Sequence, residues 1–282
     1  MPSRAETCDN RCMKKIPLYD GTIVLCMDER KHIYWVEGRK DEILCNATGV
    51  LKVMAKPFLI PWAAKMASEH WRSQIQPGKE YGELALDSIF DEAKTAHKTY
   101  TGGRGKIGSH VHDWIEKYIN YEMGLAEDPP KYPISPDLAR GVDAFLAWMD
   151  EKGDVEWMFS ERVTYHPGAG HCGTVDAVYK YQDKYYIVDF KTGSGVWPEA
   201  ALQCASYAAA LAYEFDWDLD DCCREIVHLN VKTGKHKTYS EGLIRDKLTG
   251  HGIKADYDTF RSALYVYKWI MAGPNKWAFL KS

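Results

Sequence analysis

Two acidic residues and a lysine lie on neighbouring β-like segments of this 282-residue sequence. The segment GTVDAVYKY contains Asp176, and the segment YYIVDFKTG contains Asp189 and Lys191. If a two-residue turn at 182–183 joins the segments as a hairpin, Asp176 falls directly opposite Asp189. Strand alternation places Lys191 on the same face as Asp189. The pattern therefore predicts two carboxylates and an ammonium group on one face of a sheet.

A divalent cation would relieve the repulsion between two carboxylates at this spacing. At about 5 Å, two negative charges repel by roughly 3 kcal/mol at an effective dielectric near 20. That energy is large against the marginal stability of a domain. Carboxylate oxygens are ligands that magnesium and manganese prefer. We therefore expect Mg²⁺ or Mn²⁺, as one or two ions, at Asp176 and Asp189.

Each of these charged residues, taken alone, could instead lie on a solvent-exposed hairpin surface. The neighbouring residues argue against that explanation. Val188 and Phe190 point to one face, whereas Ile187 shares the face of Asp189 and Lys191, so both faces of the strand are apolar. Charges in a strand that is buried on both sides need partners or a function.

The hydrophobic pattern indicates the elements that position these residues. A β-hairpin is expected from TIVLCMDE and HIYWVEG, followed by helices in PFLIPWAAKMASEHWRSQI, SIFDEAKTAHKTY, SHVHDWIEKYINYEMG and LARGVDAFLAWMDEKG. Strands follow near 155–166, 173–181 and 185–192, then a helix at 198–213, the strands REIVHLNVK and KHKTYS, and the helix DTFRSALYVYKWIMAG. These elements predict an α/β or α+β fold with a helical first half and a mixed sheet in the second.

Composition and charge narrow the classes of protein. The hydrophobic fraction of 45% is enough for a packed core, and the formal charge of -4 gives no overall basic surface. A nucleic-acid partner would have to be attracted by local basic clusters and bound metal. The sequence shows neither a signal peptide nor a membrane span, so a cytoplasmic location without membrane association is expected.

The eight cysteines do not suggest a disulfide framework in a chain of this length. Most are expected to be free thiols. Cys8 and Cys12 have a spacing that could hold zinc or an iron–sulfur cluster, but no second pair completes four ligands. A loose N-terminal tail is the simpler interpretation.

The segment GTVDAVYKYQDKYYIVDFKTG followed by QCASY resembles the core of the RecB-type branch of the PD-(D/E)xK nuclease superfamily. The matching patterns are G-x-x-D, D-x-K and Q-x-x-x-Y. An upstream G-x-x-x-H is supplied by Gly108 and His112. More loosely, TGVLKVMAKPFLIPWAAKMA is similar to the N-terminal region of phage and bacterial exonucleases of this branch. The cysteine triplet of its iron–sulfur members is absent, so no iron–sulfur cluster is expected.

The resemblance implies a restriction-endonuclease-like sheet flanked by helices and a set of metal ligands. Asp176 and Asp189 would bind the metal with the backbone carbonyl of Phe190, and His112 would add a nitrogen ligand. Glu161 matches an acid that holds a second metal or a metal-bound water in many members.

The resemblance also implies roles for three further residues. Lys191 would orient or activate the attacking water and stabilise charge on the phosphate. Gln203 and Tyr207 lie four residues apart on one helix, so both can face Lys191 and a DNA phosphate. His110 is displaced by about 200° from His112 around its helix, so only one of the two histidines can face the site.

The implied activity is a metal-dependent DNA exonuclease in recombination, repair or replication, encoded by a bacterium or a phage. We expect it to need a single-stranded free end, because the helical first half would roof the site and admit a threaded strand. Aromatic residues for base stacking would be Trp62, Trp71, Tyr100 and Trp114. Basic residues on a mobile loop, KTAHKTYTGGRGK, would guide phosphates: Lys94, Lys98, Arg104 and Lys106. Each of the aromatic residues could equally belong to the core.

Three regions are expected: a tail and β-hairpin over 1–47, a helical region with the histidine motif over 48–153, and a nuclease core over 154–282 that is continuous with 105–153. Three other functions stay open. They are a non-catalytic or structure-specific DNA-binding subunit, an endonuclease of the same fold, and a metal-dependent hydrolase of another substrate.

Overall fold

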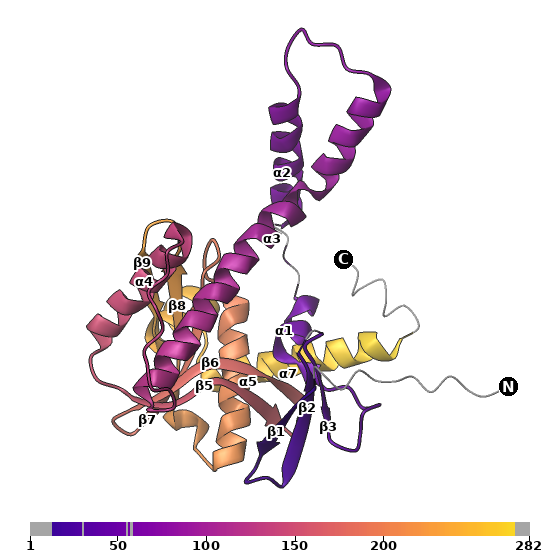
Figure 1. The fold of residues 1–282 in the computed structure, drawn as a ribbon. Coiled ribbons are helices and arrows are strands. Elements are labelled where there is room, and N and C mark those ends of the chain that lie inside the picture. The colour runs from indigo at the N-terminus through magenta and orange to yellow at the C-terminus, as the bar shows by residue number, and fades with distance from the viewer. Residues whose placement is uncertain (1–12, 30, 55, 57–58, 274–282) are drawn as a thin grey trace, which may run out of the picture.

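A computed structural model describes residues 13–29, 31–54, 56 and 59–273 of the chain (Figure 1). Cys8 and Cys12, whose spacing could hold zinc or an iron–sulfur cluster, lie outside these residues. Among the helices of the described part, none has the length and apolar character needed to cross a membrane.

The described strands form two sheets, and the larger one is mixed. The smaller sheet is antiparallel with order β1-β2-β3, comprising β1 (Met13–Leu18), β2 (Ile23–Asp28) and β3 (Ile33–Val36). The larger has order β4-β6-β7-β8-β9, with β5 also paired to β6. Its strands are β4 (Cys45–Asn46), β5 (Glu156–His166), β6 (His171–Tyr181), β7 (Lys184–Lys191), β8 (Cys222–Asn230) and β9 (Lys235–Tyr239). The pairs β4–β6 and β7–β8 are parallel, so the predicted mixed sheet is confirmed.

Helices pack on both faces of the larger sheet (Figure 1). The helical elements are α1 (Ala47–Val50), η2 (Leu51–Val53), α2 (Leu59–Gln74), α3 (Glu83–Glu122), α4 (Pro136–Lys152), α5 (Pro198–Phe215), η3 (Leu219–Asp221), α6 (Glu241–Ile244), η4 (Arg245–Thr249) and α7 (Ile253–Ala272). Val188 and Phe190 belong to a core shared with α3 and α4, whereas Ile187 belongs to one shared with α5 and α7. The prediction that β7 is buried on both faces is therefore confirmed.

The small N-terminal sheet is packed against the large one. Leu18, Leu25 and Tyr34 form a buried cluster with Tyr165 and Cys172 of β5 and β6. The predicted hairpin of β2 and β3 is confirmed, and the structure adds β1, which the sequence pattern did not indicate.

The basic segment 94–106, predicted to be a mobile loop, lies inside a helix instead. Its first residues, 94–100, are helical as the pattern SIFDEAKTAHKTY predicted, so the loop prediction is wrong from residue 101 onward. Residues from Glu83 to Glu122 form one helix of 40 residues, whereas two helices joined by a loop were expected. Each glycine in this stretch lowers helix stability by only about 1 kcal/mol relative to alanine. That penalty does not end a helix whose flanking residues favour it and whose C-terminal half is packed on the sheet.

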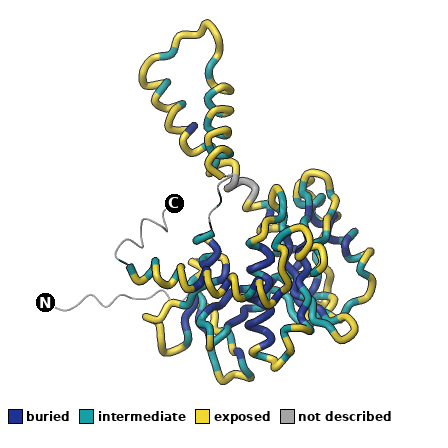
Figure 2. The backbone as a smooth tube through the Cα atoms, turned by 180° about the vertical axis from the view of Figure 1, so that it is seen from behind, coloured by how far each residue is buried: buried dark blue, intermediate teal, exposed yellow. Residues whose placement is uncertain are grey.

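The first half of α3 and all of α2 project away from the sheets as a pair of antiparallel helices, called here the projecting hairpin (Figure 1). Figure 2 shows that most of it is exposed, whereas the buried residues gather in the body. Trp71 and Phe90 stack with ring centroids 4.4 Å apart and hold the two helices together. The expected helical roof over the site is therefore wrong for this part of the chain.

Candidate metal centre

The strand β6 changes its partner at Asp176, which opens a fork in the sheet. Its last five residues pair with β7 and its first two pair with β4. The predicted register of the hairpin is confirmed as far as the pair Ala177–Val188. One step further, the predicted backbone pairing of Asp176 with Asp189 is not formed. Instead, the carboxylate Oδ2 of Asp176 accepts a hydrogen bond of 2.7 Å from the backbone N–H of Phe190.

Glu161 of β5 lies opposite Asp176 of β6 and has an unusual backbone conformation. The ladder pairs Ser160–Ala177 and Arg162–Val175 flank this position on either side. The φ of Glu161 is 46°, in the left-handed region that residues other than glycine seldom adopt. Such conformations cost about 1–3 kcal/mol and concentrate at functional sites. The strain at Glu161 therefore coincides with the fork at which the acids meet.

His112 reaches the fork from the C-terminal half of α3. Its Nδ1 lies 3.6 Å from Asp176 Oδ2 and 3.9 Å from Glu161 Oε1. One turn earlier, a Cβ at Gly108 would lie 2.6 Å from Thr192 Oγ1, so any larger residue there would force Thr192 or the helix to shift. In the G-x-x-x-H pattern, the glycine therefore lets α3 pack closely against the end of β7. The histidine one turn later then lies beside Asp176. His110, in contrast, is exposed.

The donor atoms of His112, Glu161 and Asp176 all lie within 4.8 Å of one another, a geometry that could hold a metal ion. One imidazole nitrogen and two carboxylate oxygens suit Mn²⁺ well and Mg²⁺ acceptably. Glu161, for which the sequence offered the weakest argument, belongs to this group. Asp189, predicted to be a principal ligand, is not one of the three residues and is paired with Lys191 instead.

The charged side chains at this site shift the pKa values of His112 and Asp176. Burial by itself lowers the pKa of His112, but the carboxylates of Asp176 and Glu161 outweigh it and raise the pKa to about 9. Burial raises the pKa of Asp176, and the positive charges of His112 and Lys191 oppose that shift. At neutral pH the proton on His112 therefore supplies positive charge to the two acids. A divalent cation bound there would replace it.

A chain of polar contacts lies beside His112, Glu161 and Asp176. It is formed by Asp189, Lys191, Gln203 and Tyr207. The ammonium of Lys191 donates to Asp189 Oδ1 at 2.7 Å and to Gln203 Oε1 at 3.3 Å. The amide of Gln203 donates to the hydroxyl of Tyr207 at 2.7 Å. Asp189 Oδ2 is buried and accepts no hydrogen bond of good geometry from the described residues, although Lys191 Nζ lies 2.6 Å away. The positive charge that faces this oxygen is thus the ammonium of Lys191.

The glycine of G-x-x-D and the tyrosine of Q-x-x-x-Y pack directly on each other. A Cβ at Gly173 would lie 2.5 Å from Cε1 of Tyr207, whose ring is buried. Any larger residue at this position would displace the ring, and with it the hydroxyl that accepts from Gln203. Two patterns that are separate in the sequence are therefore one structural unit.

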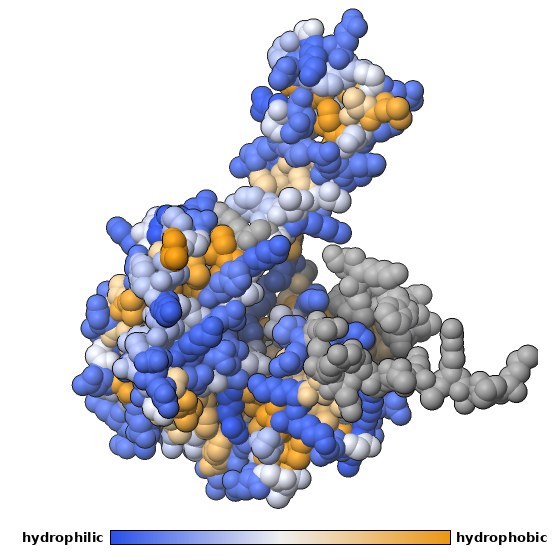
Figure 3. All heavy atoms as spheres, viewed as in Figure 1, coloured by the Kyte–Doolittle hydropathy of each residue, from blue (hydrophilic) through white to orange (hydrophobic). Residues whose placement is uncertain are grey.

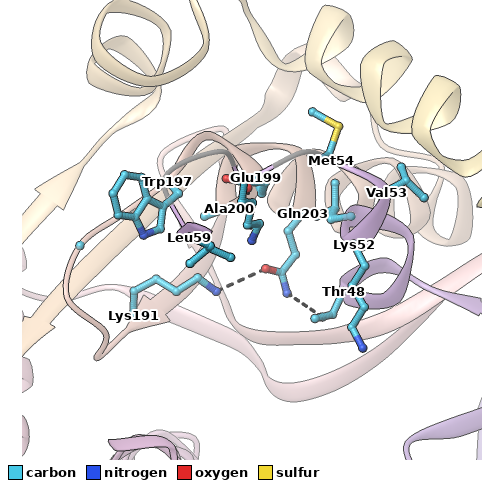
Figure 4. Close-up of a pocket in the computed structure, with 13 residues that line it drawn as sticks. Thr48, Lys52, Val53, Met54, Leu59, Lys191, Trp197, Glu199, Ala200 and Gln203 are labelled. Atoms are coloured by element: carbon cyan, nitrogen blue, oxygen red, sulfur yellow. Dashed lines mark hydrogen bonds and ion pairs between the residues drawn. The ribbon is translucent and has the colours of Figure 1, made fainter. Parts of the chain in front are cut away.

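Sequence reasoning missed Thr48, which the short helix α1 places at the same site. Its hydroxyl accepts a hydrogen bond of 3.4 Å from Gln203 Nε2 (Figure 4). The helix follows β4, a strand of two residues that pairs with the start of β6. A strand this short leaves no recognisable period, so the hydrophobic pattern gave no signal for this contact. Only the looser similarity of the segment that begins at Thr48 pointed to this part of the chain.

A cavity of about 720 Å³ adjoins the lysine chain (Figure 4). Its wall includes Lys191 and Gln203, the described residues 51–54 and 56 between α1 and α2, and Gly195 and Trp197 before α5. The chain of polar contacts therefore has a hollow next to it that is large enough for a ligand.

The basic residues expected to guide phosphates do not gather at this site. Lys94 pairs with Asp91 at 2.8 Å and lies about 27 Å along the helix axis from His112. Lys98 belongs to the same projecting half of α3, and Lys106 lies closer to His112. The side chain of Arg104 is outside the described residues.

Four aromatic residues were expected to stack on bases, and for one of them this prediction is wrong. Trp114 is buried, and its indole N–H donates to the backbone carbonyl of Lys131 at 2.9 Å, so it belongs to the core. The other three belong to the projecting hairpin, in which Trp62 contacts Tyr100 and Trp71 stacks on Phe90. They do not line the cavity beside the site.

Neither a scan against models of known protein families nor a search of curated proteins found a match to this chain. The arguments for its function are therefore the geometry of the site and the order and spacing of its motifs.

Proposed function

We propose that this protein is a metal-dependent DNA nuclease that acts as an exonuclease on strands with a single-stranded end. The observation that carries the proposal is the placement of His112, Glu161 and Asp176 within 4.8 Å of one another, beside a lysine that is paired with a buried acid. The resemblance to the RecB-type branch of the PD-(D/E)xK nucleases supports the same activity.

The residues would divide between holding the metal and fixing its surroundings. His112, Glu161 and Asp176 would hold Mg²⁺ or Mn²⁺, and Asp189 would add its buried Oδ2. The N–H of Phe190 points to Asp176, and the carbonyl of a strand residue faces the same side as its N–H, so this carbonyl is directed to the same edge. When bound, the metal polarises the phosphodiester and lowers the pKa of a coordinated water.

Lys191 would stabilise the charge that develops on the phosphate during attack by water. Its position is set from two sides, by Asp189 and by Gln203. Tyr207 and Thr48 in turn hold the amide of Gln203. These contacts orient the ammonium group before the substrate arrives, which is the condition for effective electrostatic catalysis.

The test is digestion of labelled single-stranded and duplex DNA with Mg²⁺, Mn²⁺ or EDTA. We expect digestion with either metal and none with EDTA or with the Asp189→Ala variant, which should also bind Mn²⁺ more weakly in a calorimetric titration. Absence of digestion under every metal condition would favour a DNA-binding subunit. Unchanged affinity for Mn²⁺ in the variant would move the metal elsewhere.

A second assay tests the need for a free end. A linear single strand and its circular form are compared at equal concentration with Mg²⁺. We expect the circle to resist digestion, because an exonuclease has no end from which to start. Equal degradation of the two forms would show an endonuclease.

A further inference from the structure

The cavity beside Lys191 has a wall that the proposed chemistry does not use. Apolar side chains of Leu51, Met54 and Leu59 and the indole of Trp197 line it together with Lys52. Figure 4 shows Trp197 and Leu59 on one side of the cavity and Lys52 and Thr48 on the other. Figure 4 also shows Lys191 on the side of Trp197 and Met54 on the side of Lys52, so apolar and charged side chains mix around the cavity. Such a mixed lining suits a ligand with a flat apolar part and a charged part.

Trp197 is exposed over 46% of its surface, although it lies at the start of the alanine-rich helix α5, most of which is buried. Partial exposure of a large indole beside a cavity leaves apolar surface that a ligand can cover. The residue follows the strand that carries Asp189 and Lys191 after a short loop. Trp197 therefore lies close in sequence to the end of β7 that carries Asp189 and Lys191.

The charges of the cavity favour a ligand that carries a negative group. Lys52 and Lys56 line it in addition to Lys191, and Glu199 lies 3.2 Å from the ammonium of Lys56. Two of these ammonium groups are paired, Lys56 with Glu199 and Lys191 with Asp189, so the excess positive charge at this wall comes from Lys52. A phosphate is attracted to such a wall.

We propose that this cavity binds one unpaired nucleotide of the DNA strand next to the phosphodiester that is cleaved, with its base stacked on Trp197. This inference rests on the proposed nuclease function. The volume of about 720 Å³ falls within the range of about 300–1,000 Å³ typical of sites for single small ligands. A base inside a duplex has both faces covered by its neighbours, so only an unstacked base can lie against the indole.

Base stacking on an aromatic residue tolerates every base, because each base has a π face. The cavity would therefore select unpaired DNA without selecting its sequence. Trp197 would act as a positioning residue: it holds the strand, and Lys191 acts on the phosphate. Preference for a single-stranded end would then come from the wall of this cavity, and the projecting hairpin would not be needed for it.

The experiment measures binding and cleavage separately in the variants Trp197→Ala and Trp197→Phe. Binding of a short labelled single strand is followed by fluorescence anisotropy in EDTA, in which no cleavage occurs. We expect Trp197→Ala to raise Kd by about tenfold, within the range for loss of one stacked base, and Trp197→Phe to recover most of the affinity. Trp269→Ala is the matched control, since this tryptophan is 72% exposed on α7 and does not line the cavity.

A substrate with abasic positions near its end separates stacking from a general structural effect. The wild type should lose about as much affinity on abasic DNA as Trp197→Ala loses on normal DNA, and the variant should lose little more. With Mg²⁺, Trp197→Ala should raise KM and leave kcat nearly unchanged. An unchanged Kd in Trp197→Ala, or an equal loss on normal and abasic DNA, would overturn the inference.

The two proposals fail in different ways. Digestion that is indifferent to Trp197 would support the nuclease and reject the nucleotide site. Binding that depends on Trp197, without digestion under any metal condition, would reject the nuclease and support a single-strand binding site.

Discussion

The two halves of α3 belong to one continuous helix but differ in how they are packed. In the C-terminal half, Val111, Ile115 and Ile119 are buried in the core shared with α4 and the sheet. In the N-terminal half, Leu84 is 87% exposed and Phe90 is 51% exposed. Among the described side chains of residues 83–102, Ala93 alone is buried. Figure 3 shows hydrophobic side chains gathered on one side of the projecting hairpin.

This difference shows which part of the helix fixes the site. The stability of helices in proteins comes mainly from packing of one face, and propensity adds little. The packed half sets His112 against Asp176, and its position cannot change without disturbing the core. The projecting half is held mainly by its pairing with α2. Changes in the packed half should therefore affect the candidate metal centre, whereas equivalent changes in the projecting half should not.

Among the variants that compare the two regions, the largest effect is expected from Lys191→Ala on β7, the strand whose end faces the packed half of α3. This variant removes the ammonium group that the proposed chemistry places beside the phosphate. Hydrolysis should slow by at least about a hundredfold, the scale for one electrostatic contact in a transition state. The metal should stay bound, because Lys191 is not a ligand. Single-turnover rates and Mn²⁺ titrations measure the two properties separately.

Lys94→Ala is the matched control in the projecting half, and it should leave the rate of hydrolysis unchanged. Near-normal turnover in Lys191→Ala would remove the lysine from the proposed chemistry. A loss of similar size in Lys94→Ala would show that the projecting half takes part in the reaction.

Two glycines on α3 provide a comparison of stability. A Cβ at Gly108 would lie 2.6 Å from Thr192 Oγ1, whereas a Cβ at Gly102 would meet nothing within 4 Å. Gly108→Ala should lower the free energy of unfolding by about 1–3 kcal/mol through overpacking and weaken Mn²⁺ binding by moving His112. Gly102→Ala should be neutral or should stabilise the helix by up to about 1 kcal/mol.

Urea denaturation of the two variants gives both free energies. The substitution Thr192→Ala tests whether the loss of stability comes from this contact, because it removes Oγ1, the atom that the new methyl group at position 108 would meet. The double variant of Gly108→Ala with Thr192→Ala should recover part of the lost stability. Equal stability of Gly108→Ala and Gly102→Ala would contradict the close approach of α3 to β7.

The sequence predicted most of the fold where packing produces a clear pattern. The period of two along β6 and β7 identified the two strands, and the assumption of a two-residue turn at 182–183 gave their register, which the pair Tyr181–Lys184 confirms. The pairing of β6 with β7 ends next to Asp176, and β4 pairs with the first residues of β6 instead. That exchange involves a parallel pair between residues more than a hundred positions apart in the sequence, and no local pattern encodes it.

The sequence was less informative about the projecting hairpin. Its glycines suggested a loop, since glycine has the lowest helix propensity after proline. The backbone conformation of Glu161 could not be predicted either, because it depends on the strands around it. The left-handed φ of this residue is imposed by tertiary structure.

A smaller effect is expected from pH at the metal centre. His112, whose pKa is raised to about 9, is protonated at neutral pH, and a metal must displace that proton. Mn²⁺ affinity should therefore rise with pH by up to about tenfold per pH unit and level off above about 9. Titrations from pH 7 to pH 9, in buffers with different ionisation enthalpies, measure the affinity and the protons released.

His112→Ala should weaken Mn²⁺ binding and flatten its dependence on pH, whereas His110→Ala should preserve both. His110 is the matched control because it is exposed two residues away on the same helix. Metal binding that releases no proton and does not change over this range would place His112 outside the ligand set.

The smallest effect is expected from the lysines of α3 on DNA binding. Lys106 is exposed and lies about 9 Å along the helix axis from His112, whereas Lys94 lies about 27 Å away and pairs with Asp91. Each phosphate contact contributes about 0.7 to the slope of log K against log salt for a single strand. Lys106→Ala should therefore reduce the slope by about that amount and weaken binding a few-fold, and Lys94→Ala should change neither.

If both variants behave as the wild type, the phosphate contacts lie within the cavity, at Lys52 and Lys56. If Lys94→Ala has an effect equal to that of Lys106→Ala, the strand follows the projecting hairpin, and the functional distinction between the two halves of α3 is wrong.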